Sequence, residues 1–436
     1  MQKITAKDIC EMAKGGIEIG VRQGRCYQKI NGSWQVILEG ELPIMIRRMY
    51  PIEKRTEIST SAIKEAIERL IQDPDLQLYF TEEDKEHYIN IKNGVFNTQI
   101  GALETHTQNL NFGYVLDISY IPLKNRNMQV FNKFVNSTFP EETDRKKKLL
   151  LQILGYCLSD YCKAKTGFFL VGESNSGKSV ILEFLQSIFS KQAVTAIPLY
   201  RLENRFNLAK LADARVNICT ELSEKSFQVA DIYKMLTSNE IVTAEHKGKK
   251  PFEFKIKCKS INAGNMFPNI ENLEGMDALL NRMTILLFPV SIPKEQQDLH
   301  LLEKLYEEKD AIFSSAIDEL VILQKQNFIF IEPNDTKKLK KQMKTASRVF
   351  EDFLSDCCIK EENSQEHFVI LYKAFQEYCE DNLLEVKLSK TQFSQKFARI
   401  SGIQRKKFRI HGGKPLYGVI GIRLKKIEEY IMQDSE

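Results

Sequence analysis

The apolar positions near the start of the chain follow two different periods. Alternating apolar and polar residues predict short strands at Trp34–Leu38 and Tyr88–Ile91, whereas helical spacing predicts one helix at Ser61–Ile71. The tripeptides NGS and KNG predict turns between such elements. We therefore expect residues 1–125 to form an N-terminal α+β domain.

The next segment has the apolar spacing of two helices, which the polar sequence FPEETD separates. It is predicted to form a helical collar over residues 126–160. The apolar positions that predict these helices are Phe131, Phe134, Val135, Leu150, Ile153, Leu154, Cys157 and Leu158.

Residues 161–332 combine short apolar runs with helical spacing. Phe168–Val171 reads as a buried strand, and Ile181, Leu182, Leu185, Ile188 and Phe189 share one face of the helix expected after it. A second strand is expected at Arg215–Cys219 and a third after Arg282. This pattern predicts an α/β domain. The polar, basic sequence EPNDTKKLKKQMK that follows is expected to be a linker, residues 333–348.

Residues 349–436 read as three helices followed by a two-stranded hairpin. Ser389, with Gln392 three positions later, has the spacing of a capping box at the start of the third helix. The strands are expected at about Arg405–Ile410 and Leu416–Leu424. Three helices and a hairpin predict a winged helix, which binds either duplex DNA or another protein.

Charge favours the DNA alternative. The net charge is +4, but the 41 residues from Lys387 to Ile427 contain twelve Lys and Arg and no Asp or Glu. Such a segment is typical of a module that binds a polyanion. The expected DNA contacts on the third helix are Lys390, Lys396 and Arg399, and those on the wing are Lys406, Lys407 and Arg409.

The rest of the composition is that of a globular protein, with 43% hydrophobic and 28% charged residues. The sequence has neither a long apolar run nor the apolar core of a signal peptide, so we expect a cytoplasmic protein with no membrane partner. The nine cysteines form no pattern typical of a zinc site.

One stretch, LVGESNSGKSVI, predicts a phosphate-binding loop between the strand and the helix of the α/β domain. It has the pattern G-x-x-x-x-G-K-S, in which backbone N–H groups hold phosphates, Lys178 reaches the outer phosphates and the Ser179 hydroxyl ligates Mg²⁺. The alternative is a turn that matches by accident. The expected ligands are ATP and Mg²⁺, and the expected binding residues are Gly172, Glu173, Ser174, Asn175, Ser176, Gly177, Lys178 and Ser179.

Three further residues complete a candidate catalytic set with Lys178. Glu221 follows the second strand, where a carboxylate can orient the attacking water. Asn265 follows another predicted strand and can hold that water and the γ-phosphate, and Arg282 can stabilise charge on the phosphate oxygens. Each alone is also compatible with an ordinary surface role. Thr220 occupies the position where a second acid is common, which leaves open how Mg²⁺ is held beyond Ser179.

A basic hairpin is expected between Glu221 and Asn265. The sequence HKGKK places Lys247, Lys249 and Lys250 around a turn at Gly248, before a strand in which apolar residues alternate with Glu253, Lys255, Lys257 and Lys259. A ring-shaped motor can use such a hairpin to grip a phosphate backbone. The alternative is an ordinary solvated hairpin.

The order of these motifs resembles that of superfamily 3 helicases, hexameric AAA+ motors of small viruses, phages and plasmids. The similarity to the phage/plasmid and poxvirus helicase-primase branch extends over nearly the whole chain. INIKNGVFNTQIGALETH resembles its N-terminal signature, although Asn97 stands where Asp is usual, and LLLQILGYCLSDY and RFNLAKLADARVNICTEL are also similar. The resemblance implies an AAA+ domain that, as a homohexamer, unwinds DNA 3′→5′ at a replication origin.

Two departures from the branch shape the prediction. Only about 88 residues precede the signature, too few for a primase domain, and no His-hydrophobic-His nicking motif is present. We therefore expect a helicase-initiator of a mobile genetic element that binds single- and double-stranded DNA and relies on a separate primase and host replication proteins. The alternatives are an ATP-dependent DNA-binding regulator without translocation and an origin binder with a vestigial nucleotide site.

Overall fold

The computed structural model describes most of the 436-residue chain: residues 4–22, 24–30, 33–38, 40–78, 85–106, 112–220, 222, 230–238, 240–265, 276–382, 384, 388–397, 400–409 and 414–426. The chain divides into two compact units, residues 1–266 with 282–333 and residues 267–281 with 334–436. The fold is mixed α/β with a parallel sheet. No helix among the described residues is both long and apolar enough to cross a bilayer.

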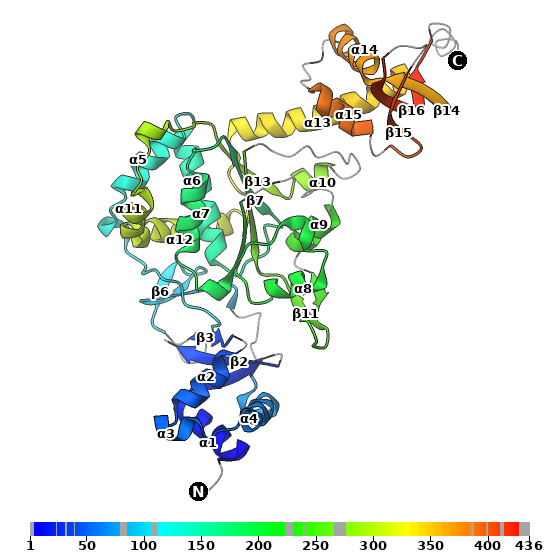
Figure 1. The fold of residues 1–436 in the computed structure, drawn as a ribbon. Helices are drawn as coiled ribbons and strands as arrows, with labels where there is room; N and C mark the ends of the chain where they lie inside the picture. Colours follow the sequence, from blue (N-terminus) through cyan, green and yellow to red (C-terminus); the bar gives the residue numbers. More distant parts are fainter. Residues whose placement is uncertain are drawn as a thin grey trace. The chain divides into compact units, whose positions relative to one another are not determined.

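The described residues between 4 and 78 form a small helical core on a three-stranded antiparallel sheet (Figure 1). The prediction of a single helix was wrong. The helices are α1 (Ala6–Gly16), α2 (Glu41–Arg48), α3 (Ile52–Arg55) and α4 (Thr60–Gln72), and the strands are β1 (Ile19–Arg22), β2 (Arg25–Ile30) and β3 (Ser33–Val36). A capping box between Thr5 and Asp8 starts α1. The helix buries only three residues, Ala6, Ile9 and Ala13, and two of them are alanines. Sparse apolar positions explain why the spacing did not predict α1.

A second antiparallel sheet follows, with strands β4 (Tyr88–Ile91), β5 (Gly94–Asn97) and β6 (Ala102–Glu104). The predicted strand Tyr88–Ile91 is confirmed at both ends. The chain after this sheet forms a hydrogen bond and an ion pair with a later helix, α12 (Lys309–Lys325). The Ser119 N–H donates to Asp310 over 2.9 Å, and Arg126 pairs with Asp318 over 2.6 Å.

The centre of the first unit is a five-stranded parallel sheet with the order β13-β7-β12-β9-β8. Figure 1 shows its helices on both faces, α5, α6, α7, α11 and α12 on one and α8 and α9 on the other. The strands are β7 (Gly167–Gly172), β8 (Val194–Thr195), β9 (Val216–Cys219), β12 (Lys259–Gly264) and β13 (Met283–Phe288). The remaining helices are α5 (Gln129–Thr138), α6 (Thr143–Leu158), α7 (Lys178–Gln186), α8 (Arg205–Leu208), α9 (Ala230–Ser238) and α11 (Leu301–Glu307).

The predicted collar helices correspond to α5 and α6, and all eight apolar positions that predicted them are buried. Gly155 lets α6 approach α12 closely, because a Cβ there would lie 2.0 Å from the Ala316 carbonyl oxygen. The carboxylate of Glu308, at the start of α12, accepts the N–H groups of Val130 and Phe131 at the start of α5. These contacts join both collar helices to α12 beside the parallel sheet.

Within its described residues, the second unit has a long helix, a three-stranded antiparallel sheet and three shorter helices. Its elements are α10 (Met276–Leu280), α13 (Asn334–Cys357), β14 (Cys358–His367), α14 (Phe368–Asp381), α15 (Lys390–Lys396), β15 (Gln404–Phe408) and β16 (Leu416–Leu424), and the sheet order is β14-β16-β15. The predicted strand Leu416–Leu424 and the capping box between Ser389 and Gln392 are confirmed.

Two predictions for this unit need correction. The expected linker, residues 333–348, is helical from Asn334 onward, because the polar stretch after Pro333 contains helix-forming Lys, Leu, Gln and Met and no Gly or Pro. Strand β14 was not predicted, and its sequence CIKEENSQEH is too polar to show alternation. It forms through backbone pairing with β16.

We predict that Gly155→Ala lowers the melting temperature of the protein. The added methyl group would meet backbone atoms of α12, and overpacking of this kind costs about 1–3 kcal/mol. Gly15→Ala is the matched control, because no atom lies within 4 Å of a Cβ at this helical position. The control should leave the melting temperature equal or slightly higher. Equal melting temperatures for both variants would contradict the tight contact between α6 and α12.

Candidate functional site

The predicted phosphate-binding loop connects β7 to α7, and its geometry requires glycine at both ends. A Cβ at Gly172 would lie 2.1 Å from the carbonyl oxygen of Phe288. Gly177 has a φ of +90°, and a Cβ there would lie 2.7 Å from the ring of Phe134 on α5. The two glycines therefore allow the loop to pack against β13 on one side and against the collar on the other.

The backbone N–H groups of the loop have no acceptor among the residues that the structure describes. No described group accepts a hydrogen bond from the N–H of any residue from Ser174 to Val180. Two loop carbonyls are bound on the outside of the loop, where Ser174 accepts from the Ser291 hydroxyl and Asn175 accepts from the Ile292 N–H. N–H groups at the start of a helix, with the helix dipole behind them, are suited to bind a phosphate.

Lys178 is buried within this loop. Its ammonium group donates to the carbonyl oxygens of Gly172 and Glu173, each over 2.6 Å, and to the Ser176 hydroxyl over 2.9 Å. Burial lowers the pKa of Lys178. These carbonyl and hydroxyl oxygens are uncharged acceptors, so the charged oxygens of a bound phosphate could replace them at the ammonium group.

The residues present fit Mg²⁺ bound with a nucleotide. Ser179 lies exposed in the first turn of α7, where its hydroxyl can supply one ligand. Among the described residues, no group of three or more His, Cys, Asp and Glu side chains could hold a metal alone. Mg²⁺ often takes most of its ligands from phosphates and water, so one protein hydroxyl is compatible with its binding.

Parallel register brings the other candidate residues to the edge of the sheet where the loop lies. Gly264 at the end of β12 pairs with Val171 on β7, and Cys219 at the end of β9 pairs with Asn262. Asn265 is therefore exposed beside the loop. Glu221 lies outside the described residues, so its assigned role stays a prediction. Its neighbour Leu222 donates its N–H to Ala263 at this same edge.

Arg282 does not lie beside this loop. It precedes Met283, which pairs with Gly167 at the opposite end of β7. Six residues of strand span about 20 Å, so Arg282 cannot reach a phosphate bound by the loop of its own chain. Its guanidinium group instead donates to the Thr237 hydroxyl over 3.0 Å.

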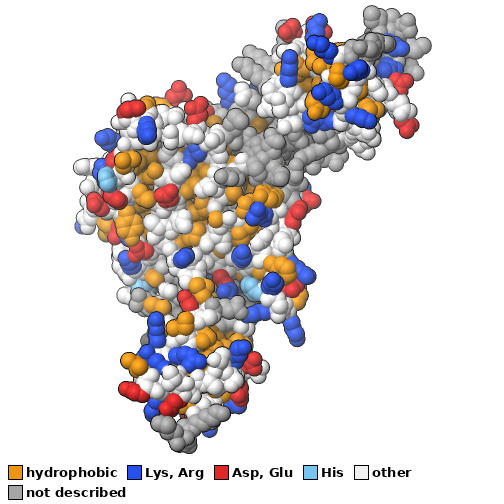
Figure 2. All heavy atoms as spheres, in the orientation of Figure 1, with side chains coloured by type: hydrophobic (Ala, Val, Ile, Leu, Met, Phe, Trp, Pro, Cys, Tyr) orange, Lys and Arg blue, Asp and Glu red, His pale blue; other side chains and the backbone are white. Residues whose placement is uncertain are grey.

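The expected basic hairpin is present as β10 (Ile241–Ala244) and β11 (Phe252–Lys255), paired antiparallel. Gly248 has a φ of +76° at the turn, and the side chains of Lys247, Lys249 and Lys250 are exposed. Figure 2 shows Lys and Arg side chains projecting where Figure 1 draws this hairpin. The alternation placed Lys259 on the solvent-exposed face of the same strand as Lys255. Lys259 is instead buried, because it is the first residue of the next strand, β12, which is buried along its whole length.

The candidate DNA-binding residues of the second unit have different outcomes. Lys390, Lys406, Lys407 and Arg409 are exposed, and Figure 2 shows basic side chains gathered on the visible face of this unit. Arg399 lies outside the described residues. The prediction that Lys396 is exposed was wrong. Its side chain is 7% exposed and its ammonium group lies 5.2 Å from the centroid of the Phe350 ring, because Lys396 shares a helical face with buried Phe393.

The sequence did not reveal the residues that hold the loop from outside. Phe134 packs on Gly177, and Ser291 and Ile292 bind the loop carbonyls. Phe134 was predicted only as a collar residue, since apolar spacing does not show which neighbour an apolar side chain meets. Ser291 and Ile292 follow β13, and no sequence pattern distinguishes them.

Two family models match separate parts of the chain. The model described as "D5 N terminal like" matches residues 24–140, and a family of unknown function, DUF5906, matches residues 170–281. Domains of these two kinds are typical of phage and plasmid primase-helicase proteins, which associates the chain with DNA replication. The second match includes the loop, Glu221 and Asn265. No curated protein matches the sequence.

Solved structures similar to this chain include two of the NrS-1 C-terminal region without ligand. One has 12% sequence identity and a TM-score of 0.48, and covers 96% of this chain and 100% of that chain. The other has 14% identity and a TM-score of 0.46, and covers 95% of this chain and 99% of that chain. Both TM-scores are below 0.5, so the likeness is distant.

We predict that inorganic pyrophosphate raises the melting temperature of the protein, because it would bind the loop N–H groups, which have no described acceptor, only in the folded state. Gly177→Ala should abolish this increase, since the added methyl group meets Phe134 and the φ of +90° is strained for alanine. Gly101→Ala is the control. It has a similar φ of +69° but open space around it, so it should keep the response to pyrophosphate. A full response in Gly177→Ala would show that the anion binds elsewhere.

Proposed function

We propose that the protein is an ATP-driven DNA helicase and replication initiator that works as a homohexamer. One observation carries the ATPase part of this proposal. Seven consecutive N–H groups, from Ser174 to Val180, have no described acceptor and stand at the start of α7. This arrangement favours a chain of phosphates, with Lys178 and Ser179 beside it.

The sheet order supports hydrolysis at this loop. Strand β12 lies between β7 and β9, so the amide of Asn265 stands between the phosphate loop and the end of β9. In the proposed reaction Glu221 orients a water molecule for attack on the γ-phosphate, and Asn265 holds that water. Mg²⁺, when bound with ATP, would neutralise charge on the phosphates, with the Ser179 hydroxyl as a ligand.

The position of Arg282 supports a ring of several copies. Because Arg282 lies at the sheet edge opposite its own loop, we propose that it acts on the ATP held by a neighbouring copy. Each site would then need two subunits, and hydrolysis would depend on assembly. This arrangement gives Arg282 the role predicted from the sequence, but in a different subunit.

DNA contacts are proposed for both units. The exposed lysines of the β10–β11 hairpin would grip the backbone of a single strand in the ring. The second unit has the element order of a winged helix, with β14 as the additional strand, and would bind origin duplex through α15 and β15. The AAA+ class, 3′→5′ polarity and a separate primase are part of the proposal through the resemblance of the sequence motifs.

We predict that Lys178→Ala and Glu221→Gln separate nucleotide binding from hydrolysis. The first variant removes the ammonium group that reaches the phosphates and should weaken ATP binding. The second removes only the carboxylate that orients water, so it should bind ATP normally and lose turnover by about 100-fold or more. Equilibrium binding of a fluorescent ATP analogue and phosphate release measure the two effects. Normal turnover in Glu221→Gln would show that another group orients the water.

We predict that Lys247→Ala with Lys249→Ala stops unwinding while leaving the ATPase site intact. Both side chains are exposed at the turn, so the fold and the hydrolysis of ATP without DNA should persist. Stimulation of ATPase by single-stranded DNA and displacement of a forked strand should be lost, because backbone contacts provide the grip.

The hairpin variant also has an internal control. Binding of duplex DNA by the second unit should be retained, since Lys390, Lys406 and Lys407 are unchanged. The regulator alternative predicts a different result, namely ATP-dependent duplex binding in the unmodified protein with no strand displacement. Normal unwinding by the double variant would exclude the hairpin from the mechanism.

A further inference from the structure

The first half of helix α13 carries a concentration of positive charge to which no role has been assigned. From Thr336 to Phe350 the sequence contains six Lys and Arg residues and no Asp or Glu. Three of these lysines, Lys337, Lys338 and Lys341, have exposed side chains on the helix. We call these three side chains the α13 strip.

The charges of the α13 strip have no partner among the residues that the structure describes. No described carboxylate pairs with any of its three ammonium groups. The other two lysines in this half of the helix, Lys340 and Lys344, each have an interaction of their own and are not counted in the strip. The strip therefore keeps three cationic groups available to a ligand.

The strip is open because α13 packs through its other side. Thr336 is buried, and Leu339 and Met343 are half-buried. The hydrophobic core of the second unit includes α13 only from Val349 onward, so the strip precedes the part of the helix that this core holds. Figure 1 shows the first half of α13 extending away from α14 and α15.

These lysines are unfavourable for the helix that carries them. Lys341 lies four positions after Lys337 and three after Lys338, and like charges at these spacings repel each other on a helix surface. Lys337 also lies at the end of the first turn, where the helix dipole disfavours a cation. Positions at which a sequence breaks local rules without compensation are often functional.

A chain of phosphates would compensate both unfavourable effects, because it is the charge complement of the strip. We propose that the α13 strip binds the phosphate backbone of the DNA duplex that α15 and β15 are proposed to bind. Duplex DNA is favoured because α13 belongs to the same compact unit as those two elements. The strip spans about 6 Å of helix, over which one DNA strand presents about two phosphates.

The proposed contacts would increase affinity without selecting a sequence. Phosphates are the same at every base pair, so the strip would strengthen binding to any duplex and leave the reading of bases to α15. This inference rests on the proposed function in one respect, namely that the second unit binds duplex DNA. It does not depend on hydrolysis of ATP or on translocation.

The salt dependence of duplex binding tests the strip in the full-length protein. The variant is Lys337→Ala with Lys338→Ala and Lys341→Ala, and the probe is a mixed-sequence DNA duplex followed by fluorescence anisotropy over a series of KCl concentrations. The slope of log affinity against log salt concentration should become shallower by about 0.9 for each phosphate contact that is lost. Affinity at low salt should fall with it.

A second triple variant is the matched control for net charge. Lys64→Ala with Lys124→Ala and Lys325→Ala removes the same charge from exposed lysines of the first unit, and none of these lysines has a partner among the described residues. This variant should keep the slope of the unmodified protein.

The melting temperature separates a binding role from a structural one. Without DNA, the α13 variant should melt at the same temperature as the unmodified protein or higher, because alanine favours the helix and the repulsion is removed. With the duplex added, it should gain less stability than the unmodified protein. A lower melting temperature without DNA would show that these lysines stabilise the fold and would contradict the proposed role.

The outcomes distinguish this inference from the proposed function, with ATPase activity and strand displacement measured in parallel. An unchanged slope in the α13 variant would overturn the strip and leave the motor as proposed. Weaker binding of single strands with unchanged duplex binding would also overturn the duplex assignment. Absence of duplex binding by the unmodified protein would overturn both the strip and the initiator role. A shallower slope in a protein without ATPase activity would support the strip and contradict the motor.

Discussion

The parallel register of β7 with its two neighbours is the constraint on which the candidate site depends. Because β12 and β13 run in the same direction as β7, all carboxyl ends meet at one edge and all amino ends at the other. The loop and Asn265 lie at the first edge, and Arg282 lies at the second. A shift of one residue in β12 would also turn buried Ile261 and Ala263 away from the core, so packing and site geometry are fixed together.

The sequence predicted best the elements that are set by local chemistry. The loop pattern identified where β7 ends and α7 begins, and Ser389 with Gln392 identified the start of α15, because capping and phosphate binding need particular residues at fixed spacing. Strand β14 and helix α1 were not predicted. A polar strand is stabilised by its partner's backbone, and a short helix with few apolar residues by neighbours distant in sequence, and neither cause is visible locally.

The same distinction applies to the site residues. The position of Asn265 follows from its place directly after an apolar strand of the parallel sheet, and such strands are visible in the sequence. The burial of Lys396 and the orientation of Arg282 toward Thr237 depend on tertiary packing. Spacing alone could place Lys396 on the helix, but only the position of Phe350 on α13 decides that its ammonium group lies against a ring. Charge counts over a segment therefore predict a basic surface more reliably than they predict which lysines form it.

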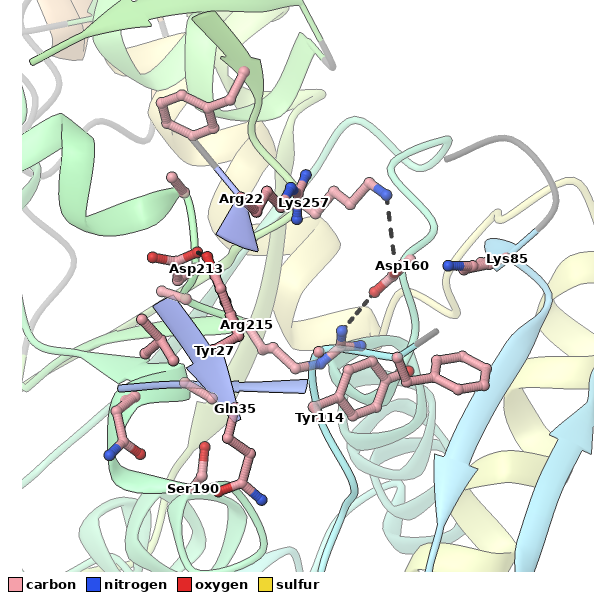
Figure 3. A pocket seen from close by; sticks show the side chains of 18 of the residues that line it. Arg22, Tyr27, Gln35, Lys85, Tyr114, Asp160, Ser190, Asp213, Arg215 and Lys257 are labelled. Atoms are coloured by element: carbon pink, nitrogen blue, oxygen red, sulfur yellow. Dashed lines mark hydrogen bonds and ion pairs between the residues drawn. The ribbon is translucent and has the colours of Figure 1, made fainter. Parts of the chain in front are cut away.

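The two edges of the sheet carry different features of the candidate site. At the carboxyl edge, the donors are backbone N–H groups at the start of α7, a geometry that fits a compact chain of phosphates. At the amino edge, the connection from the basic hairpin enters β12, and Lys257 in that connection pairs with Asp160 over 3.8 Å (Figure 3). Strand β12 connects them, with buried Lys259 at its amino end and Asn265 just beyond its carboxyl end. In the proposed motor, this strand of six residues would connect ATP hydrolysis at the carboxyl edge directly to the basic hairpin that precedes it at the amino edge.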